Sequence, residues 1–275
     1  MNTKNLHILI VVYNESLDNC TSLLSIINSD IISRFNGSLK ITIVNNGPNR
    51  VSFPDYLVNY NYAITLLQPL KNLPLSKIYN ETIINSDSDY YMILDHDSNL
   101  SPEYLSDVEK ICNDEFIHYL SVPIIYDDKG IVSPIFTRES IADIKCDDLV
   151  TGIGSGIIIS SILKMDFLEK YNEVFDGRFA LYGVDTSLFR RLKILNNTNR
   201  INYIRGFDHS FSKDTAEHKS QFRMNERAID VGISLRYYFS VDLFVYFLHL
   251  CFKYFNIESF ILLIKYFVLG KHPRC

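Results

Sequence analysis

The sequence contains no tryptophan, and its five cysteines, at positions 20, 112, 146, 251 and 275, include no Cys-x-x-Cys pair. An odd and scattered set of cysteines argues against a disulfide framework or a structural zinc site and indicates a reducing compartment. Basic residues are fewer than acidic ones, 27 against 32, which argues against a general nucleic-acid-binding protein. No apolar run reaches the roughly 20 residues that a membrane-spanning helix needs, so we expect no such span.

The chain has enough apolar material for a sizeable core. Hydrophobic residues make up 47% and charged residues 21% of its 275 residues, which excludes a disordered chain. Short apolar runs rich in β-branched residues alternate with stretches of helical spacing. The strands are predicted at residues 6–12, 39–44, 62–67 and 90–94, and the helices at 15–30 and 75–84. This alternation predicts an α/β fold, with a mostly parallel sheet flanked by helices.

After residue 115 the pattern changes. A β-hairpin is predicted from residues 119–126 and 131–136, a helix at 185–195 and a short strand at 201–204. We expect residues 1–240 to form one domain with two halves, 1–115 and 116–240, followed by an apolar helical segment at 241–275.

That last segment is the most apolar part of the chain, and its polar residues fall on one narrow stripe per helix. Two interpretations remain open. The helices pack on the sheet domain as core, or they lie in the plane of a membrane surface, with Lys253 and Lys265 reaching outward and a basic end at 271–274.

The residues that indicate chemistry follow a predicted buried strand. Asp95 and Asp97 flank His96 directly after residues 90–94. Ligands of open α/β sheets bind at the carboxyl ends of the strands, and paired carboxylates there suit Mg²⁺ or Mn²⁺. Taken alone, an Asp-x-Asp pair is more often a turn or a solvated pair.

Four further features fall at places where a nucleotide-sugar enzyme needs polar groups. The first predicted strand ends in Val12-Tyr13-Asn14-Glu15, and the second ends at Asn45. Asp185 begins a helical stretch, where it could equally be a helix cap. His209 follows a short strand, and a neutral imidazole there could complete a metal site.

In this order, the motifs resemble the GT-A glycosyltransferases of family 2, over roughly residues 6–240. The likeness is to the bacterial rhamnosyltransferase-like branch that builds O-antigen and capsule. The matching segments are Val11-Val12-Tyr13-Asn14, Leu94-Asp95-His96-Asp97-Ser98, Val184-Asp185 through Arg191, and His209.

The resemblance implies an inverting, metal-dependent hexosyl- or rhamnosyltransferase that uses a nucleoside-diphosphate sugar. Asp95, Asp97 and His209 would hold Mn²⁺ or Mg²⁺ on the diphosphate, and Asp185 would be the general base. Residues 1–115 would then be the nucleotide-binding half and residues 116–240 the acceptor half. The predicted donor-binding residues are Val12, Tyr13, Asn14, Glu15, Asn45, Lys77, Asp95, His96 and Arg191. Arg191 could equally be solvated, as most helix lysines such as Lys77 are.

Two departures from the family pattern concern the donor. Asn45 stands where the family has an aspartate that contacts the base, and Ser187-Leu188 stands where rhamnosyltransferases tend to have Glu-Trp. The acceptor implied by the resemblance is a lipid-linked saccharide at the cytoplasmic face of the cell membrane, with the protein as a peripheral enzyme. The alternatives are a nucleotidyltransferase on a related fold and a catalytically inactive sugar-binding module.

Overall fold

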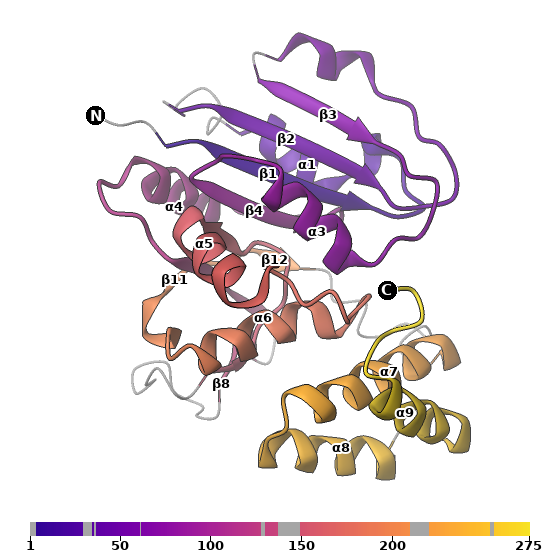
Figure 1. The fold of residues 1–275 in the computed structure, drawn as a ribbon. Coiled ribbons are helices and arrows are strands. Elements are labelled where there is room, and N and C mark those ends of the chain that lie inside the picture. Colours follow the sequence, from indigo (N-terminus) through magenta and orange to yellow (C-terminus); the bar gives the residue numbers. More distant parts are fainter. Residues whose placement is uncertain are drawn as a thin grey trace.

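The apolar runs of the first hundred residues form one side of a twisted sheet (Figure 1). Four strands lie parallel to one another in the order β3-β2-β1-β4, and β1 is buried along its whole length. The computed structural model describes residues 4–29, 35, 37–60, 62–127, 130–136, 149–209, 220–253 and 256–275.

The sheet continues beyond β4 through three further strands, in the order β4-β10-β6-β11. β10 runs antiparallel to both of its neighbours, whereas β11 is parallel to β6, and β7 adds an antiparallel partner to β6. The main strands are β1 (Leu6–Val12), β2 (Leu39–Asn45), β3 (Ala63–Leu67), β4 (Tyr90–Asp95), β6 (Leu120–Asp127), β7 (Gly130–Ser133), β10 (Ile158–Ser160) and β11 (Ile201–Arg205). Two small pairs lie outside this sheet: β5 (Ser98–Asn99) with β12 (Asp208–His209), and β8 (Ile135–Phe136) with β9 (Leu149–Thr151). The predicted fold class, α/β with a mostly parallel sheet, is confirmed.

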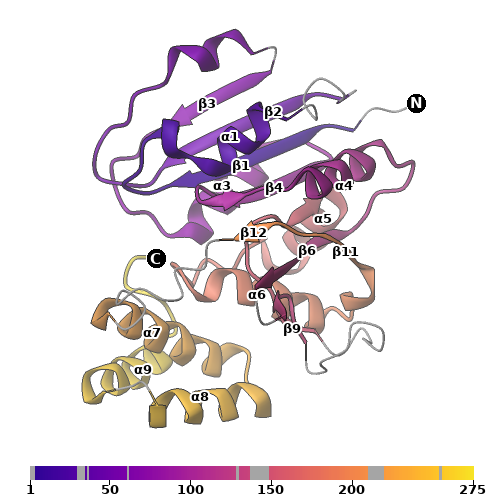
Figure 2. The same ribbon diagram turned by 180° about the vertical axis from the view of Figure 1, so that it is seen from behind.

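Helices cover both faces of the sheet, and alternate residues of β1 serve the two faces (Figures 1 and 2). Leu9 and Val11 pack toward α3 and α5, whereas Ile8 and Ile10 pack toward α1 and α4. The helices are α1 (Thr21–Ile27), α3 (Leu75–Ile84), α4 (Pro102–Asn113), α5 (Ser161–Tyr171), α6 (Gly183–Ile194), α7 (Gln221–Tyr237), α8 (Val241–Lys253) and α9 (Ile257–Leu269).

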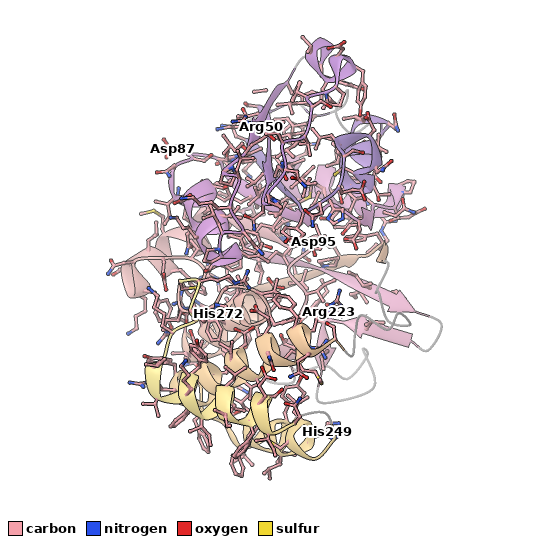
Figure 3. All side chains as sticks on the ribbon, turned by 90° about the vertical axis from the view of Figure 1, so that its right-hand side faces the viewer. Arg50, Asp87, Asp95, Arg223, His249 and His272 are labelled. Atoms are coloured by element: carbon pink, nitrogen blue, oxygen red, sulfur yellow. The ribbon has the colours of Figure 1, made fainter. Side chains whose placement is uncertain are left out.

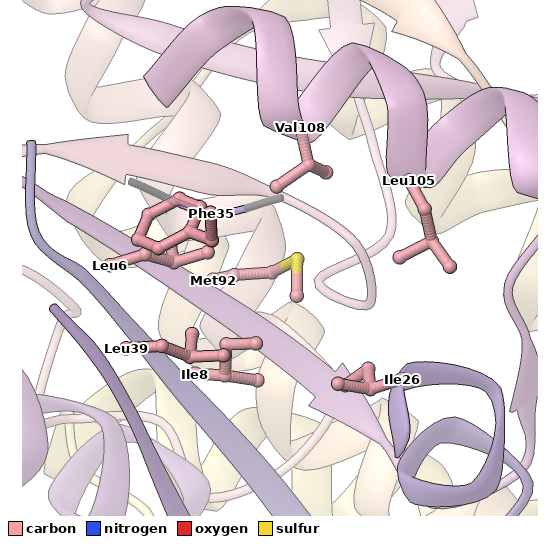
Figure 4. A pocket seen from close by; sticks show the side chains of 8 residues that line it. All are labelled: Leu6, Ile8, Ile26, Phe35, Leu39, Met92, Leu105 and Val108. Carbon is pink, nitrogen blue, oxygen red and sulfur yellow. The ribbon is translucent and has the colours of Figure 1, made fainter. Parts of the chain in front are cut away.

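A small cavity of about 10 Å³ lies on the α1 and α4 side of the sheet (Figure 4). Its walls are entirely apolar: Leu6, Ile8, Ile26, Phe35, Leu39, Met92, Leu105 and Val108. A water or polar ligand there would find no hydrogen-bond partner, so this is a packing void and not a binding site.

Two sequence expectations about helices are corrected by the structure. The helix expected over residues 15–30 is shorter, because the chain first makes a 3-10 turn at Leu17–Asn19 and is extended at Cys20 before α1 begins. Helices α5 and α7 were not expected.

The hairpin is confirmed as the antiparallel pair β6 and β7, although its tip, residues 128–129, lies outside the described residues.

The C-terminal helices form a layer of their own with α7, away from the four-stranded parallel part of the sheet (Figures 1 and 2). Leu243 and Leu250 of α8 meet Leu263 of α9 and Val231 of α7 in a separate core. The domain boundary at residue 240 stays a prediction. Within the described residues, no helix is long and apolar enough to cross a membrane.

The basic end, which one of the two interpretations places at a lipid surface, is partly folded back on the protein. The imidazole of His272 is buried, 3.4 Å from the carboxylate of Glu226, and Arg274 pairs with the same carboxylate. Lys271 remains exposed. Glu226 therefore contacts two residues of the segment 271–274, which one of the two interpretations places at a membrane surface.

Candidate active site

The carboxyl ends of β1, β2 and β4 lie side by side, and the site begins there. After β1, Asn14 takes a left-handed conformation (φ 54°), which an asparagine tolerates, so the chain turns sharply away from the sheet. Tyr13 is exposed, whereas the Val12 side chain is buried and offers a ligand only its backbone. Glu15 accepts hydrogen bonds from the Asn19 side chain and the Ser16 amide, which lower the pKa of Glu15.

The end of β2 is held by its own asparagines. The Asn45 side chain donates to the Asn49 carbonyl (2.7 Å) and accepts from the Gly47 amide (3.1 Å), which closes a tight turn. Asn46 exchanges hydrogen bonds with the backbone of Leu73 and so fixes the loop before α3. The polar groups of Asn45 thus serve the fold, and their contact with a nucleotide base stays a prediction.

The turn after β4 carries Asp95, His96 and Asp97, and two serines fix its backbone. Ser22 of α1 donates its hydroxyl to the carbonyl of Asp95, and its amide donates to the His96 carbonyl (3.2 Å). Ser155 accepts from the Asp95 amide (3.0 Å). Asp95 lies near the middle of the molecule (Figure 3).

The segment 152–156 brings Asp185 to the Asp95 side of the sheet. A Cβ on Gly154 would lie 2.3 Å from Oδ1 of Asp185, so only glycine leaves room for that carboxylate. A Cβ on Gly152 would likewise collide with the ring of Phe189, which lies on α6, as Asp185 does. Ser155 accepts from the Asp95 amide, so two adjacent residues, Gly154 and Ser155, contact Asp185 and Asp95 respectively. The glycines therefore set the approach of α6 to the turn that carries Asp95, His96 and Asp97.

Electrostatic coupling indicates that these groups lie near one another. Burial raises the pKa of Asp95 to about 6, with a further contribution from Asp97. Burial and the charge of Asp95 raise the pKa of Asp185 to about 7, which the Gly154 amide opposes. The buried phenol of Tyr79, on α3, has a raised pKa because of burial and both carboxylates. Oδ1 of Asp185 is buried and has no hydrogen-bond partner in the described structure.

Comparison with solved structures shows which proteins share this fold. S. aureus TarS superposes with a TM-score of 0.54 at 12% identity, covering 98% of this chain but only 50% of TarS. TarS 1–349 in complex with UDP-GlcNAc gives 0.51 at 12% identity, over 98% of this chain and 82% of that one. Glucosyl-3-phosphoglycerate synthase from Mycobacterium tuberculosis, with Mn²⁺, UDP and glucosyl-3-phosphoglycerate, gives 0.51 at 13% identity, over 82% and 78%.

This chain has a GT-A-like fold. It spans half the length of full-length TarS, and identities near 12% establish the fold alone. No family model matches the chain, and no curated protein matches it in sequence.

The donor set at the β4 turn fits a hard divalent cation. Asp97 raises the pKa of Asp95, so the two carboxylates repel each other and a cation between them would offset that repulsion. The backbone of His209 pairs with Ser98, one residue beyond Asp97. The side chain of His209 lies outside the described structure, and among the described residues no three metal-binding side chains gather in one cluster. The role of His209 as third ligand stays a prediction.

Two of the predicted donor-binding residues lie in other surroundings. Lys77 is exposed beside Glu81 and lines a cleft of about 600 Å³ whose walls include neither Asp95 nor Asp185. Arg191 is buried and not solvated. It pairs with Glu173 (2.7 Å) and donates to the Tyr238 hydroxyl (3.2 Å), which ties α6 to the segments that follow α5 and α7. Their contacts with a diphosphate stay predictions that no contact in the structure supports.

Several site residues escaped the sequence analysis. Gly154 contributes space, Ser22 and Ser155 contribute backbone hydrogen bonds, and Tyr79 contributes a buried phenol. The cluster of glycines at 152–156 was a visible signal, but its partner, Asp185, lies some thirty residues further along the chain.

Proposed function

We propose that the protein is a metal-dependent glycosyltransferase that moves a sugar, with inversion, from a nucleoside-diphosphate donor to a saccharide acceptor. One observation carries this proposal: the unpartnered, buried Oδ1 of Asp185 lies against Gly154, next to the residue that holds Asp95. This carboxylate oxygen is not engaged by a donor within the described residues, and it comes from a different element than the turn that carries Asp95 and Asp97.

The reaction is a single displacement. Asp185 accepts the proton of the acceptor hydroxyl while that oxygen bonds to the anomeric carbon. The bond from that carbon to the diphosphate oxygen breaks on the opposite side, and the nucleoside diphosphate leaves. Asp97, with Asp95, would hold Mn²⁺ or Mg²⁺, which neutralises the charge that develops on the leaving diphosphate. Tyr13, Asn14 and Glu15 would line the nucleotide pocket.

The first test is donor binding to the full chain. We expect one nucleoside diphosphate or its sugar to raise the melting temperature with Mn²⁺ by about 5 °C at 100 times its dissociation constant. The same ligand should give no shift after EDTA treatment. If no nucleoside diphosphate stabilises the protein while ATP and Mg²⁺ do, the nucleotidyltransferase alternative is favoured. Metal-dependent binding without turnover of any sugar would favour the inactive sugar-binding module.

We further propose that the acceptor is a lipid-linked saccharide of bacterial surface polysaccharide (O-antigen or capsule), with the protein at the cytoplasmic face of the membrane. The support is an exposed stripe on the last two helices, here called the apolar helical face. It comprises Val241, Phe244, Val245 and Leu248 of α8 with Ile257, Phe260, Ile261, Ile264 and Val268 of α9. Exposed apolar surface of this extent marks an interaction site. A membrane interface accepts such a stripe from a helix lying in its plane.

A triple substitution tests the membrane surface. Val245→Ser, Ile261→Ser and Val268→Ser together change side chains that are 58–65% exposed, so the fold should persist. We expect the wild type to sediment with anionic phospholipid vesicles and the triple variant to stay in solution. The matched control changes Val58, Phe116 and Met165 to serine. These side chains lie elsewhere on the protein and are 62–78% exposed, so this variant should still sediment. If the wild type does not sediment but forms a dimer that the triple variant loses, the face contacts a second copy and the membrane proposal is wrong.

A further inference from the structure

The start of α6 is held by a carboxylate from another helix. Asp230 of α7 is buried (4% exposed), and its Oδ2 accepts the amide of Gly183 at 3.1 Å. The amide of Tyr182 also acts on this carboxylate. These two amides belong to the first residues of α6, and Tyr182 provides no side-chain cap of its own. The first amides of a helix have no partner within it, so here a residue 47 positions away supplies one.

The use of Asp230 as the cap of α6 costs folding free energy, because its carboxylate is buried and incompletely hydrogen-bonded. Its second oxygen, Oδ1, is buried without a hydrogen-bond partner. Burial, and next the charge of Glu226, raise the pKa of Asp230 to about 8. Helices α4, α5 and α9 of the same chain use local Ser101, Ser160 and Asn256 instead. Burying a carboxylate with only one of its oxygens hydrogen-bonded costs folding free energy. This cost indicates that Asp230 serves to position α6 rather than to stabilise the fold.

The geometry concerns Asp185, which lies two residues beyond Gly183 in the first turn of α6. Little room exists for that turn to shift. A Cβ on Gly183 would lie 2.0 Å from the Phe179 ring, and the carboxylate of Asp185 already fills the space beside Gly154. Asp230 is itself fixed, because a Cβ on Gly232 of the same helix would lie 2.4 Å from the carbonyl of Leu263 in α9.

We propose that Asp230 is a positioning residue, which holds the first turn of α6 so that the Asp185 carboxylate faces the metal-binding turn. This inference rests on the proposed function of Asp185. It links the C-terminal layer to the site, because α7 is clamped between α6 and α9.

The test compares three variants of the full chain. Asp230→Asn keeps an oxygen that can accept the Gly183 amide, and its kcat should stay within about threefold of the wild type. Asp230→Ala removes the acceptor of the Gly183 amide. We expect the Asp185 carboxylate, the proposed general base, to move by about 1 Å, which should lower kcat by about 10²-fold. The donor KM should change less than threefold. Ser160→Ala, which removes the cap of α5, is the control: it should lower the melting temperature but leave kcat unchanged.

A second readout does not depend on activity. Amide hydrogen exchange at residues 182–185 should be faster in Asp230→Ala than in Asp230→Asn, with the rest of α6 unchanged. If Asp230→Ala does not fold, Asp230→Glu, which displaces the same oxygen, should show the same loss of kcat. The proposal would be overturned if kcat of Asp230→Ala were no lower than kcat of Ser160→Ala. A wild type with no transferase activity contradicts the proposed function instead, and the exchange result would then decide the capping role by itself.

Discussion

Replacing Asp97 by alanine is expected to abolish sugar transfer and metal-dependent donor binding while the fold persists. Asp97 follows β4 at the carboxyl edge of the sheet, and its charge acts on Asp95. Without it the cation would lose a carboxylate ligand, and a metal ion contributes several kcal/mol to stabilising the leaving group. We therefore expect kcat/KM to fall by about 10³-fold or more, measured with saturating and limiting Mn²⁺.

Asp87→Ala is the matched control for this prediction. Asp87 is exposed and precedes the same strand, so it tests the loss of an aspartate at the opposite end of β4. Figure 3 shows Asp87 at the edge of the molecule and Asp95 near its middle. The control should retain full activity. Near-normal activity in Asp97→Ala, or activity that EDTA does not reduce, would show that the metal role is wrong.

Replacing Asp185 by asparagine is expected to lower kcat by about 10²-fold or more, the scale of removing a general base. Asparagine has nearly the same shape and fits beside Gly154, so α6 should keep its place. Donor affinity, measured by the thermal shift with nucleoside diphosphate and Mn²⁺, should stay within about threefold of the wild type.

The control is Asp87→Asn, which should match the wild type in kcat and in melting temperature. A variant of Asp185 that loses donor affinity but keeps kcat at saturation would make this carboxylate a binding residue. In that event the proton acceptor would have to be sought elsewhere at the site.

Strands and helices with strong apolar patterns were predictable. Residues 6–12 and 75–84 were expected as strand and helix, and β1 and α3 have these same bounds. A continuous run of β-branched residues favours a strand, and a clear helical period favours a helix, so each segment has one preferred secondary structure. The pair Asp95 and Asp97 could also be placed at the sheet edge, because a buried strand ends directly before them.

Helix α7 shows why other elements could not be predicted. Its buried face includes Glu226, Asp230 and Ser234, so it lacks the apolar period that indicates a packed helix. Partners from other segments contact these buried side chains, such as Arg274 for Glu226 and Arg190 for Ser234. A single sequence does not reveal such long-range pairs.

Only part of the site could be predicted, because its long-range contacts are not visible in a single sequence. The residue types of Asp95, Asp97 and Asp185 indicate their chemistry, but their proximity depends on Gly154 and Ser155, which carry no chemistry of their own. Arg191 shows the reverse case. Its charge suggested a diphosphate contact, yet the phase of α6 directs it to Glu173 and Tyr238.

The most direct test is a time course of sugar transfer by the full chain, followed by proton NMR of the anomeric signals. The reaction would contain Mn²⁺, the donor that stabilises the protein and a saccharide acceptor, with a parallel sample in EDTA. We predict that donor is consumed, that product appears with inverted anomeric configuration, and that EDTA stops both. Retained configuration, or transfer that continues at the same rate in EDTA, would contradict the account.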